Sequence, residues 1–463
     1  MRARFTAVAL AAALLALCSC VGLTRTNGGG QAGSMQSVQH IVYMVQENRS
    51  FDHYFGQLGQ YRAANNLGAA SDIDGLPSWA WNAADNGTIL HSFHLATTCV
   101  EEFSDDWMES HIDMNENHPG SSTILLDGFV HIAGAYALFF GEQDTLGVRA
   151  MGYYDQNELP YYYFLASQYA TSDRWFSPIP TESIPNRIYL IAATSAGHAH
   201  APTDTYPCCE SQIPETIFSE MQSAGVSWKI YYTDTLPNGQ PLTDLGQFWP
   251  NFAAQHSANI VPVSQYFTDL ANNTLPQVSF IQSGLASGRD EHPGGQTTPG
   301  EGGNDIQKGA LYVSSLINGL MSSSSWASSI FILSYDEGGG FYDHVPPQAA
   351  VQPDGIKPFD LIPGDSIVNP PADFNQTGFR LPLMVVSPFS KKHYVSHTVA
   401  DNTAILKLIE TRFGLPSLTK RDAAQMDMSE FFDFTNSIVS NTPVPPAQPV
   451  AGLCNPTDLP ASP

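Results

Sequence analysis

The stretch Ile41-Val42-Tyr43-Met44-Val45 leads into Glu47-Asn48-Arg49-Ser50-Phe51-Asp52-His53-Tyr54, and this junction decides the fold. A short apolar run rich in β-branched residues is typical of a buried strand, so the polar residues should lie at its carboxyl end. In open α/β sheets that end borders the ligand crevice. An acid, an amide and a guanidinium gathered there are costly to desolvate unless a metal ion or a bound oxyanion compensates. The junction therefore predicts a binding site, or alternatively a solvated loop that caps a helix at Ser50 or Asp52.

Other apolar runs predict more parallel strands, with helical segments between several of them. The predicted strands cover 41–45, 187–192, 277–281, 329–334 and 381–387. The predicted helices cover 160–170, 306–321 and 403–413. This alternation favours a doubly wound α/β sheet with helices on both faces. The stretches 56–128 and 202–245 are longer than ordinary connections, so we expect them to shape a pocket or lid.

The beginning of the chain has the layout of an export signal. Arg2 and Arg4 precede an apolar run over 5–17 that is too short for a membrane span. Residues 1–20 therefore predict a signal peptide and an exported protein, in the periplasm, the outer cell envelope or the medium. Leu17 and Ser19 before Cys20 resemble a lipoprotein processing box, which would anchor the chain to a membrane through a lipid on Cys20. Ordinary signal cleavage is the alternative.

The rest of the chain divides into three parts. Residues 21–37 predict a flexible tether, 38–430 the folded catalytic domain and 431–463 a Pro-rich tail. From residue 441 onward we expect the tail to lie on the surface or to be disordered.

The charge balance excludes some partners. Lys and Arg number 19 against 44 Asp and Glu, a formal net charge of −25 without any basic cluster. This argues against nucleic acid and against electrostatic docking on anionic lipid. The acidic surface of a soluble exported protein is the simpler interpretation.

Four cysteines follow the predicted signal: Cys99, Cys208, Cys209 and Cys454. Disulfides are plausible in an oxidising compartment, but adjacent cysteines rarely pair with each other. The expectation is a bridge from Cys99 to Cys208 or Cys209.

A serine lies in a stiff turn before the apolar run at 188–191. Pro180 and Pro185 flank Ser183, whose hydroxyl could be a nucleophile if a base or a metal lowers its pKa. An ordinary Ser-Pro turn or a helix cap is the alternative.

Two acids follow the apolar run at 330–333. Asp336 and Glu337 are adjacent and precede three glycines, which let the backbone approach a ligand closely. Neighbouring carboxylates repel each other unless a cation lies between them, so an oxygen-ligand metal site is predicted. A capping acid pair at a Gly-rich turn is the alternative.

These clusters carry a family resemblance. The chain looks like the bacterial phospholipase C and acid phosphatase family of phosphoesterases over roughly 38–415. The matching segments are, in order, Glu47-Asn48-Arg49-Ser50-Phe51-Asp52-His53, Met151-Gly152-Tyr153-Tyr154, Pro185-Asn186-Arg187, Asp290-Glu291-His292-Pro293 and Asp336-Glu337-Gly338-Gly339-Gly340-Phe341-Tyr342-Asp343-His344.

The resemblance implies an alkaline-phosphatase-like α/β core with long active-site insertions and a phospho-enzyme mechanism. Ser183 matches the nucleophile. One or more divalent metal ions would be held by Glu47, Asn48, Asp336 and Glu337. His292, His344 and His111 match histidines that hold phosphate oxygens or protonate the leaving group. Arg187 and Asn186 would bind substrate, although a structural salt bridge is the alternative for Arg187.

The chain departs from the family pattern at two positions. Many relatives have a histidine where this chain has Asp105, and another where it has Gly338. Fewer cationic donors weaken the binding of a phosphate dianion, which puts the substrate in doubt. The expected function is an exported metal-dependent phosphoesterase of the phospholipase C type, acting on a phospholipid or a small phosphate ester. The alternatives are an acid phosphatase for soluble phosphomonoesters and a non-catalytic, lipid-anchored protein that binds phosphate esters.

Overall fold

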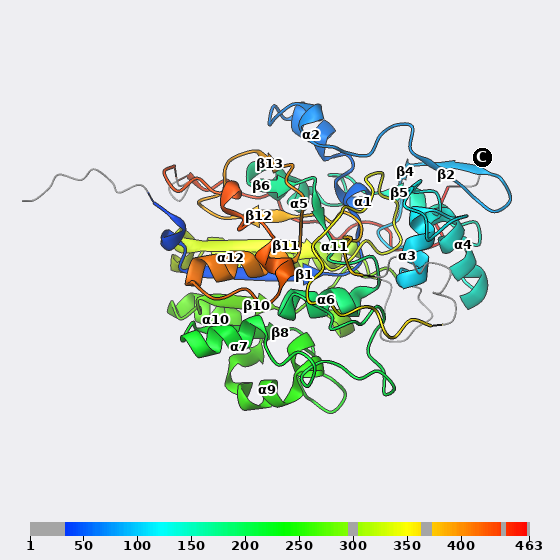
Figure 1. Cartoon of the computed structure of the whole chain (residues 1–463). Coiled ribbons are helices and arrows are strands. Elements are labelled where there is room, and N and C mark those ends of the chain that lie inside the picture. Colours follow the sequence, from blue (N-terminus) through cyan, green and yellow to red (C-terminus); the bar gives the residue numbers. More distant parts are fainter. Residues whose placement is uncertain (1–32, 295–303, 363–372, 437–440, 461–463) are drawn as a thin grey trace, which may run out of the picture.

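The centre of the molecule is an eight-stranded sheet in the order β13-β6-β12-β11-β1-β10-β8-β9 (Figure 1). The computed structural model describes residues 33–294, 304–362, 373–436 and 441–460. The strands of the sheet are β1 (His40–Gln46), β6 (Ala170–Ser172), β8 (Trp228–Tyr232), β9 (Ile260–Pro262), β10 (Val278–Ile281), β11 (Ser329–Tyr335), β12 (Met384–Val386) and β13 (Tyr394–Ser396). Short strands outside it are β2 (Trp81–Ala83), β3 (Ile89–His91), β4 (Phe93–His94), β5 (Gly152–Tyr153), β7 (Trp175–Phe176) and β14 (Ala400–Asp401).

Strand β1 lies in the middle and is parallel to both neighbours. Its Ile41 is in register with Val278 of β10 and with Ile330 of β11. Residues 41–46 of β1 and all of β10 and β11 are buried, as expected for a sheet covered on both faces. The predicted strands at 41–45, 277–281 and 329–334 are confirmed.

Helices cover both faces of the sheet. Helix α6 contacts both α7 and α12 on one face, where Figure 1 shows α12 in front of β1. Helix α11 contacts both α5 and α10 on the other face. The mostly parallel α/β architecture is therefore confirmed. The helices are α1 (Phe51–Phe55), α2 (Leu58–Ala64), α3 (Trp107–Met114), α4 (Phe129–Phe140), α5 (Pro160–Gln168), α6 (Ser183–Ala192), α7 (Ile217–Ala224), α8 (Asp244–Phe248), α9 (Pro250–Gln255), α10 (Ser264–Asn272), α11 (Ile306–Met321), α12 (Thr403–Phe413) and α13 (Lys420–Ala423).

Local sequence signals explain where the long helices begin and end. Asp305 caps α11 by accepting a hydrogen bond from the Gln307 amide. Gly414 ends α12 in the left-handed conformation, with φ 70°, which glycine adopts without steric cost. The predicted helices at 306–321 and 403–413 match α11 and α12.

Two predicted strands are wrong in type or direction. Residues 187–192 belong to the helix α6, in which all residues from Pro185 to Ala192 are buried. A short apolar run in a buried helix has the same sequence pattern as a buried strand, so the pattern could not distinguish the two. The run at 381–387 contains β12, which is antiparallel to β11 and β6. The chain enters β12 from the carboxyl edge of the sheet, because Arg380 is bonded there to Asp52 and Asp343.

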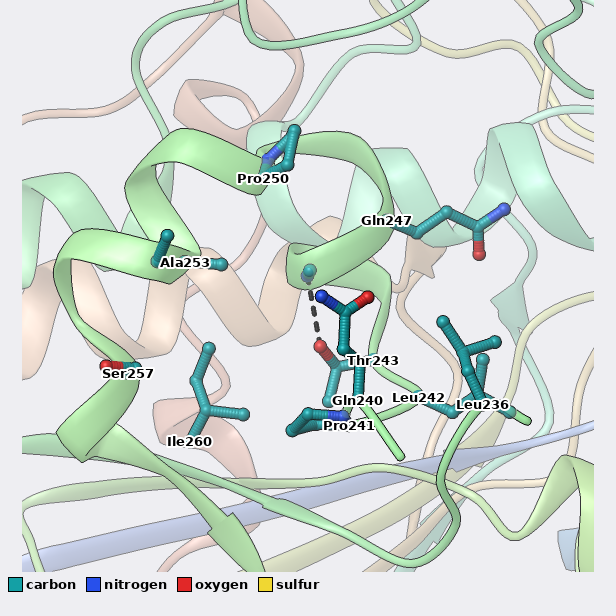
Figure 2. Close-up of a pocket in the computed structure, with 12 residues that line it drawn as sticks. Leu236, Gln240, Pro241, Leu242, Thr243, Gln247, Pro250, Ala253, Ser257 and Ile260 are labelled. Carbon is teal, nitrogen blue, oxygen red and sulfur yellow. Dashed lines mark hydrogen bonds between the residues drawn. The ribbon is translucent and has the colours of Figure 1, made fainter. Parts of the chain in front are cut away.

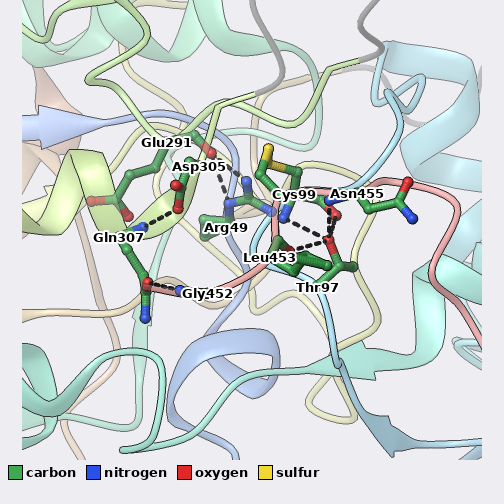
Figure 3. Close-up of a disulfide and its surroundings, with 10 residues drawn as sticks. Arg49, Thr97, Cys99, Glu291, Asp305, Gln307, Gly452, Leu453 and Asn455 are labelled. Carbon is green, nitrogen blue, oxygen red and sulfur yellow. Dashed lines mark hydrogen bonds between the residues drawn. A yellow bond between two sulfur atoms is a disulfide. The ribbon is translucent and has the colours of Figure 1, made fainter. Parts of the chain in front are cut away.

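The C-terminal segment crosses back to the insertion that follows β1. Cys99 forms a disulfide with Cys454, so the expected pairing of Cys99 with Cys208 or Cys209 is wrong (Figure 3). The pairing follows from the path of the tail, since the Thr98 amide donates to the Leu453 carbonyl at 2.9 Å. The described part of the tail, 441–460, thus lies against the folded body.

The two adjacent cysteines pair with each other. A disulfide joins Cys208 and Cys209 across a cis peptide bond, so the expectation that they would not pair is wrong as well. Within the described ranges, no helix has the length and apolar character of a membrane span. The predicted signal at 1–20, with Cys20, and most of the tether at 21–37 lie outside the described residues.

Candidate active site

Ser183 is the first residue of α6 and lies at the carboxyl end of the sheet. The turn before it is held by Asn186, whose side-chain oxygen accepts from the Ile179 amide at 3.0 Å. The Asn186 amide group donates to the carbonyls of Thr181 and Glu182. Asn186 is buried, and its side-chain oxygen and nitrogen both bond to the backbone of this turn. The structure therefore favours a role in positioning Ser183 over direct contact with substrate.

The end of β1 brings Glu47 and Asn48 to Ser183. The Ser183 hydroxyl lies 2.9 Å from Oε2 of Glu47 and 2.9 Å from Oδ1 of Asn48, and can donate its proton to either. Asn48 has a left-handed backbone, with φ 55°, which asparagine tolerates better than most residues. Gly339 packs on this turn so closely that a Cβ there would lie 2.4 Å from the Asn48 carbonyl oxygen. The glycines after Glu337 therefore permit the close approach of two strand ends.

Arg187 forms ion pairs with three carboxylates beneath the serine. Its Nε donates to Asp336 at 3.0 Å, Nη1 to Asp244 at 3.2 Å and Nη2 to Glu47. All four side chains are almost fully buried. The guanidinium is thus committed to the protein, which favours the salt-bridge alternative over direct binding of phosphate.

Glu337 and Asp105 form a second acidic pair beside Asn48. Asn48 Nδ2 donates to Asp105 at 3.1 Å, and Asp105 lies near enough to Glu337 for its charge to act on that carboxyl. Burial, followed by the charge of Asp105, raises the pKa of Glu337 well above its usual range. Burial also raises the pKa of Asp105 to about 6. Two acids this close are stable only if they share a proton or a cation.

The predicted metal ligands are of a chemical type that suits a divalent cation. Oε1 of Glu337 is buried and has no hydrogen-bond partner among the described residues. Burial raises the pKa of Glu47 well above normal, with Arg187 opposing the shift and Asp336 adding to it. Carboxylate and amide oxygens from Glu47, Asn48, Asp336 and Glu337 are hard ligands of the kind that Mg²⁺ and Ca²⁺ prefer. Within the described residues, however, Glu47, Asp336 and Glu337 are not among the groups whose ligand atoms all lie within 4.8 Å of one another, and Asp336 and Glu337 do not line the cavity of Ser183.

His292, in the loop after β10, lies beside Asn48. Its Nε2 lies 3.1 Å from Nδ2 of Asn48, and its Nδ1 lies 3.2 Å from Glu102. Burial alone would lower the pKa of His292, but the adjacent carboxylate of Glu102 raises it well above its usual value. The protonated imidazole is therefore favoured, and His292 lines the same cavity as Ser183.

The other two predicted histidines lie elsewhere. His344 Nδ1 is 2.6 Å from Asp52 and its Nε2 is 3.1 Å from Asp74, so carboxylates hold both ring nitrogens. His111 packs on Trp107 and directs Nδ1 at that residue's carbonyl at 2.6 Å. It lines a separate cavity with Trp107 and Met114. Neither is among the described residues that line the cavity of Ser183.

A cavity of about 380 Å³ opens above Ser183. Its walls also include residues that the sequence analysis missed, namely Glu182, Asp244, Gln282 and Asn304. Gln282 directly follows β10, so the strand-end rule could have found it, whereas no local signal marks Asp244. Glu182 also forms a small group with Asp106 and His200 whose ligand atoms lie within 4.8 Å of one another.

Comparisons with known proteins identify the family to which the chain belongs. A family model described as the Phosphoesterase family matches residues 38–416. Phospholipase C A of Mycobacterium tuberculosis is 29% identical over 458 residues, covering 89% of this chain and 80% of that protein. Non-specific phospholipase C4 of Arabidopsis thaliana is 29% identical and covers 87% of this chain and 72% of its own.

Solved structures resemble the chain more distantly. The lipoteichoic acid synthase LtaP of Listeria monocytogenes is 12% identical with a TM-score of 0.35, covering 60% of this chain and 70% of that one. A protein of the alkaline phosphatase superfamily from Vibrio parahaemolyticus is 12% identical with a TM-score of 0.33, covering 79% of each chain. On the family match, this chain belongs to the Phosphoesterase family and is a hydrolase that acts on phosphate esters.

Proposed function

We propose that the protein is an exported, metal-dependent phosphoesterase of the phospholipase C type that works through a phosphorylated Ser183. The observation that carries the proposal is the Ser183 hydroxyl, 2.9 Å from both Glu47 and Asn48 in a cavity lined by ionisable groups. A serine beside a base and a cation site is an activated nucleophile. The names of the relatives support a phospholipid substrate.

The residues supply each proton and bond change. Ser183 Oγ attacks phosphorus and passes its proton to Glu47 while the bond from phosphorus to the glycerol oxygen breaks. His292 gives its proton to that departing oxygen. Water then attacks the phosphorus of the phosphoserine and gives one proton to His292, while the bond from phosphorus to Ser183 Oγ breaks. Glu47 returns its proton to Ser183 Oγ, and the phosphorylated headgroup leaves with the remaining hydroxyl of the water. A divalent cation held by Glu47, Asn48, Asp336 and Glu337 would lower the pKa of the hydroxyl and neutralise charge on the phosphoryl oxygens.

The N-terminus of α6 supports the same assignment. A phosphoryl group on Ser183 would lie at the start of a ten-residue helix, where amide N–H groups and the helix dipole favour an anion.

The charge of the cavity favours a phosphodiester over a phosphomonoester. Glu47, Asp105, Glu182, Asp244 and Asp290 all line it. Where these acids are ionised, a monoester dianion meets about twice the repulsion of a diester monoanion. Acid phosphatase activity on soluble monoesters is therefore the second candidate.

The test is Ser183→Ala, assayed on phosphatidylcholine and on p-nitrophenyl phosphate with divalent ions and with chelator. The variant should lose at least about 10³-fold in kcat, because it lacks the attacking oxygen. Ser195→Ala is the control, since Ser195 is a buried serine bonded to the His198 carbonyl. Wild-type turnover by a folded Ser183→Ala protein would remove Ser183 from the mechanism.

A further inference from the structure

A second cavity of about 720 Å³ adjoins the cavity of Ser183 (Figure 2). It lies between the loop 236–243, the helices α8 and α9, and the start of β9. Figure 2 shows Leu236 and Leu242 at one end and Ala253, Ser257 and Ile260 at the other. The two cavities share the wall residues Leu242, Thr243 and Gln247. The two cavities therefore lie next to each other at this stretch of wall.

The two cavities differ sharply in chemistry. No charged side chain is among the described residues that line the larger one, and more than half of its wall is Leu, Ile, Pro and Ala. The cavity of Ser183, by contrast, is lined by carboxylates together with Arg187 and His292. An ionic cavity beside an apolar cavity suits an amphiphilic molecule whose polar group lies at Ser183 and whose apolar part lies in the larger cavity.

The shared wall is fixed to the catalytic helix. Asp244 begins α8 and binds Nη1 of Arg187 on α6 at 3.2 Å. Gln282 donates to the same Asp244 carboxylate at 3.0 Å. Thr243 caps α8 by accepting from the Gly246 amide at 3.0 Å. The distance from the apolar cavity to Ser183 is therefore set by buried ionic contacts.

We infer that this apolar cavity binds an acyl chain of the diacylglycerol portion of a glycerophospholipid while its phosphate lies at Ser183. The inference rests on the proposed phospholipase C function and adds to it a site for the leaving group. Volumes of about 300–1,000 Å³ are usual for small-molecule sites, so the cavity is of suitable size. Because burial of each methylene is favourable, the specificity constant should rise about fourfold per added methylene until the cavity is filled.

The experiment compares phosphatidylcholines with acyl chains of about four to eight carbons, each below its critical micelle concentration. Ala254→Phe fills the cavity, and Leu236→Asp places a charge in its wall at an exposed loop position. Each variant should reduce the preference for long over short chains at least tenfold. Ala271→Phe, on the exposed face of α10 and outside the cavity wall, is the matched control and should keep the wild-type preference.

A binding measurement separates this inference from the proposed function. Calorimetry with dihexanoylglycerol should give binding to wild type and to Ala271→Phe, and at least tenfold weaker binding to Ala254→Phe, whether or not any substrate is turned over. If the protein hydrolyses no phosphatidylcholine, the proposed function fails, and the calorimetry still decides the cavity. Equal chain-length preference or equal binding in wild type, Ala254→Phe and Leu236→Asp would overturn the inference.

Discussion

Replacing Arg187 with methionine should strongly destabilise the protein. The substitution keeps much of the apolar stem but removes the guanidinium that bonds Glu47, Asp244 and Asp336. The side chains of these carboxylates are 2%, 5% and 1% exposed, so water cannot replace the lost donors. In protein kept in chelator, three buried acids would then face one another without the guanidinium that contacts all of them.

The magnitude follows from the cost of leaving buried charge unpaired. Removal of one member of a buried ion pair costs about 3–5 kcal/mol. A whole domain has a free energy of unfolding of about 5–15 kcal/mol, so the variant should lose a large part of it. Because the unpaired acids can take up protons, the folded variant binds more protons than its unfolded chain. Its deficit relative to wild type should therefore grow as the pH rises from about 5 to 8.

Urea unfolding followed by tryptophan fluorescence at several pH values measures this effect. Arg174→Met is the matched control, because the Arg174–Asp74 pair is 26% and 42% exposed and should contribute less than about 1 kcal/mol. A loss below about 1 kcal/mol in Arg187→Met, or a loss independent of pH, would refute the role of Arg187 as the counter-ion of the three acids.

Two further predictions concern stability. The Cys99→Ser, Cys454→Ser double variant removes a disulfide that joins residues 355 positions apart. Denaturant titrations should show a free energy of unfolding lower by about 2–5 kcal/mol. An unchanged denaturation midpoint would show that the disulfide does not stabilise the fold. Burial, with Asp422 beside it, raises the pKa of Glu410 to about 8, so wild type should lose stability as the pH rises from about 4.5 to 8. Glu410→Gln has no proton to lose at this position, so its melting temperature should rise relative to that of wild type as the pH increases across that range. A difference in melting temperature that is the same at all pH values would contradict the raised pKa of Glu410.

The sequence predicts the centre of the fold well because its strands are continuous apolar runs. β1, β10 and β11 are buried on both faces and carry that pattern plainly. β6 carries no such signal, since Thr171 and Ser172 are buried polar residues satisfied by the carbonyls of Leu383 and Ser396. Those partners come from segments more than 200 residues away, which no local pattern reveals.

The sequence predicts the site residues that follow the ends of strands. It does not predict the residues that reach the site only through tertiary contacts. Glu47, Asn48 and Ser183 meet as the strand-end rule and the family resemblance imply. Asp244 comes from a long insertion and joins the site through Arg187 and Gln282. His344 matches the family pattern in sequence, yet Asp52 and Asp74 hold its ring away from the cavity lining, and sequence alone carries no information on that pairing.

The most direct test of the central claim is to trap the covalent intermediate. Wild-type protein would be mixed with a phosphatidylcholine, quenched with acid within milliseconds to seconds, and digested for mass spectrometry. The mechanism predicts that the peptide containing Ser183 gains the mass of the phosphorylated headgroup, and that Ser183→Ala gives no adduct. Complete turnover with no adduct at any quench time, or an adduct on a different residue, would contradict it.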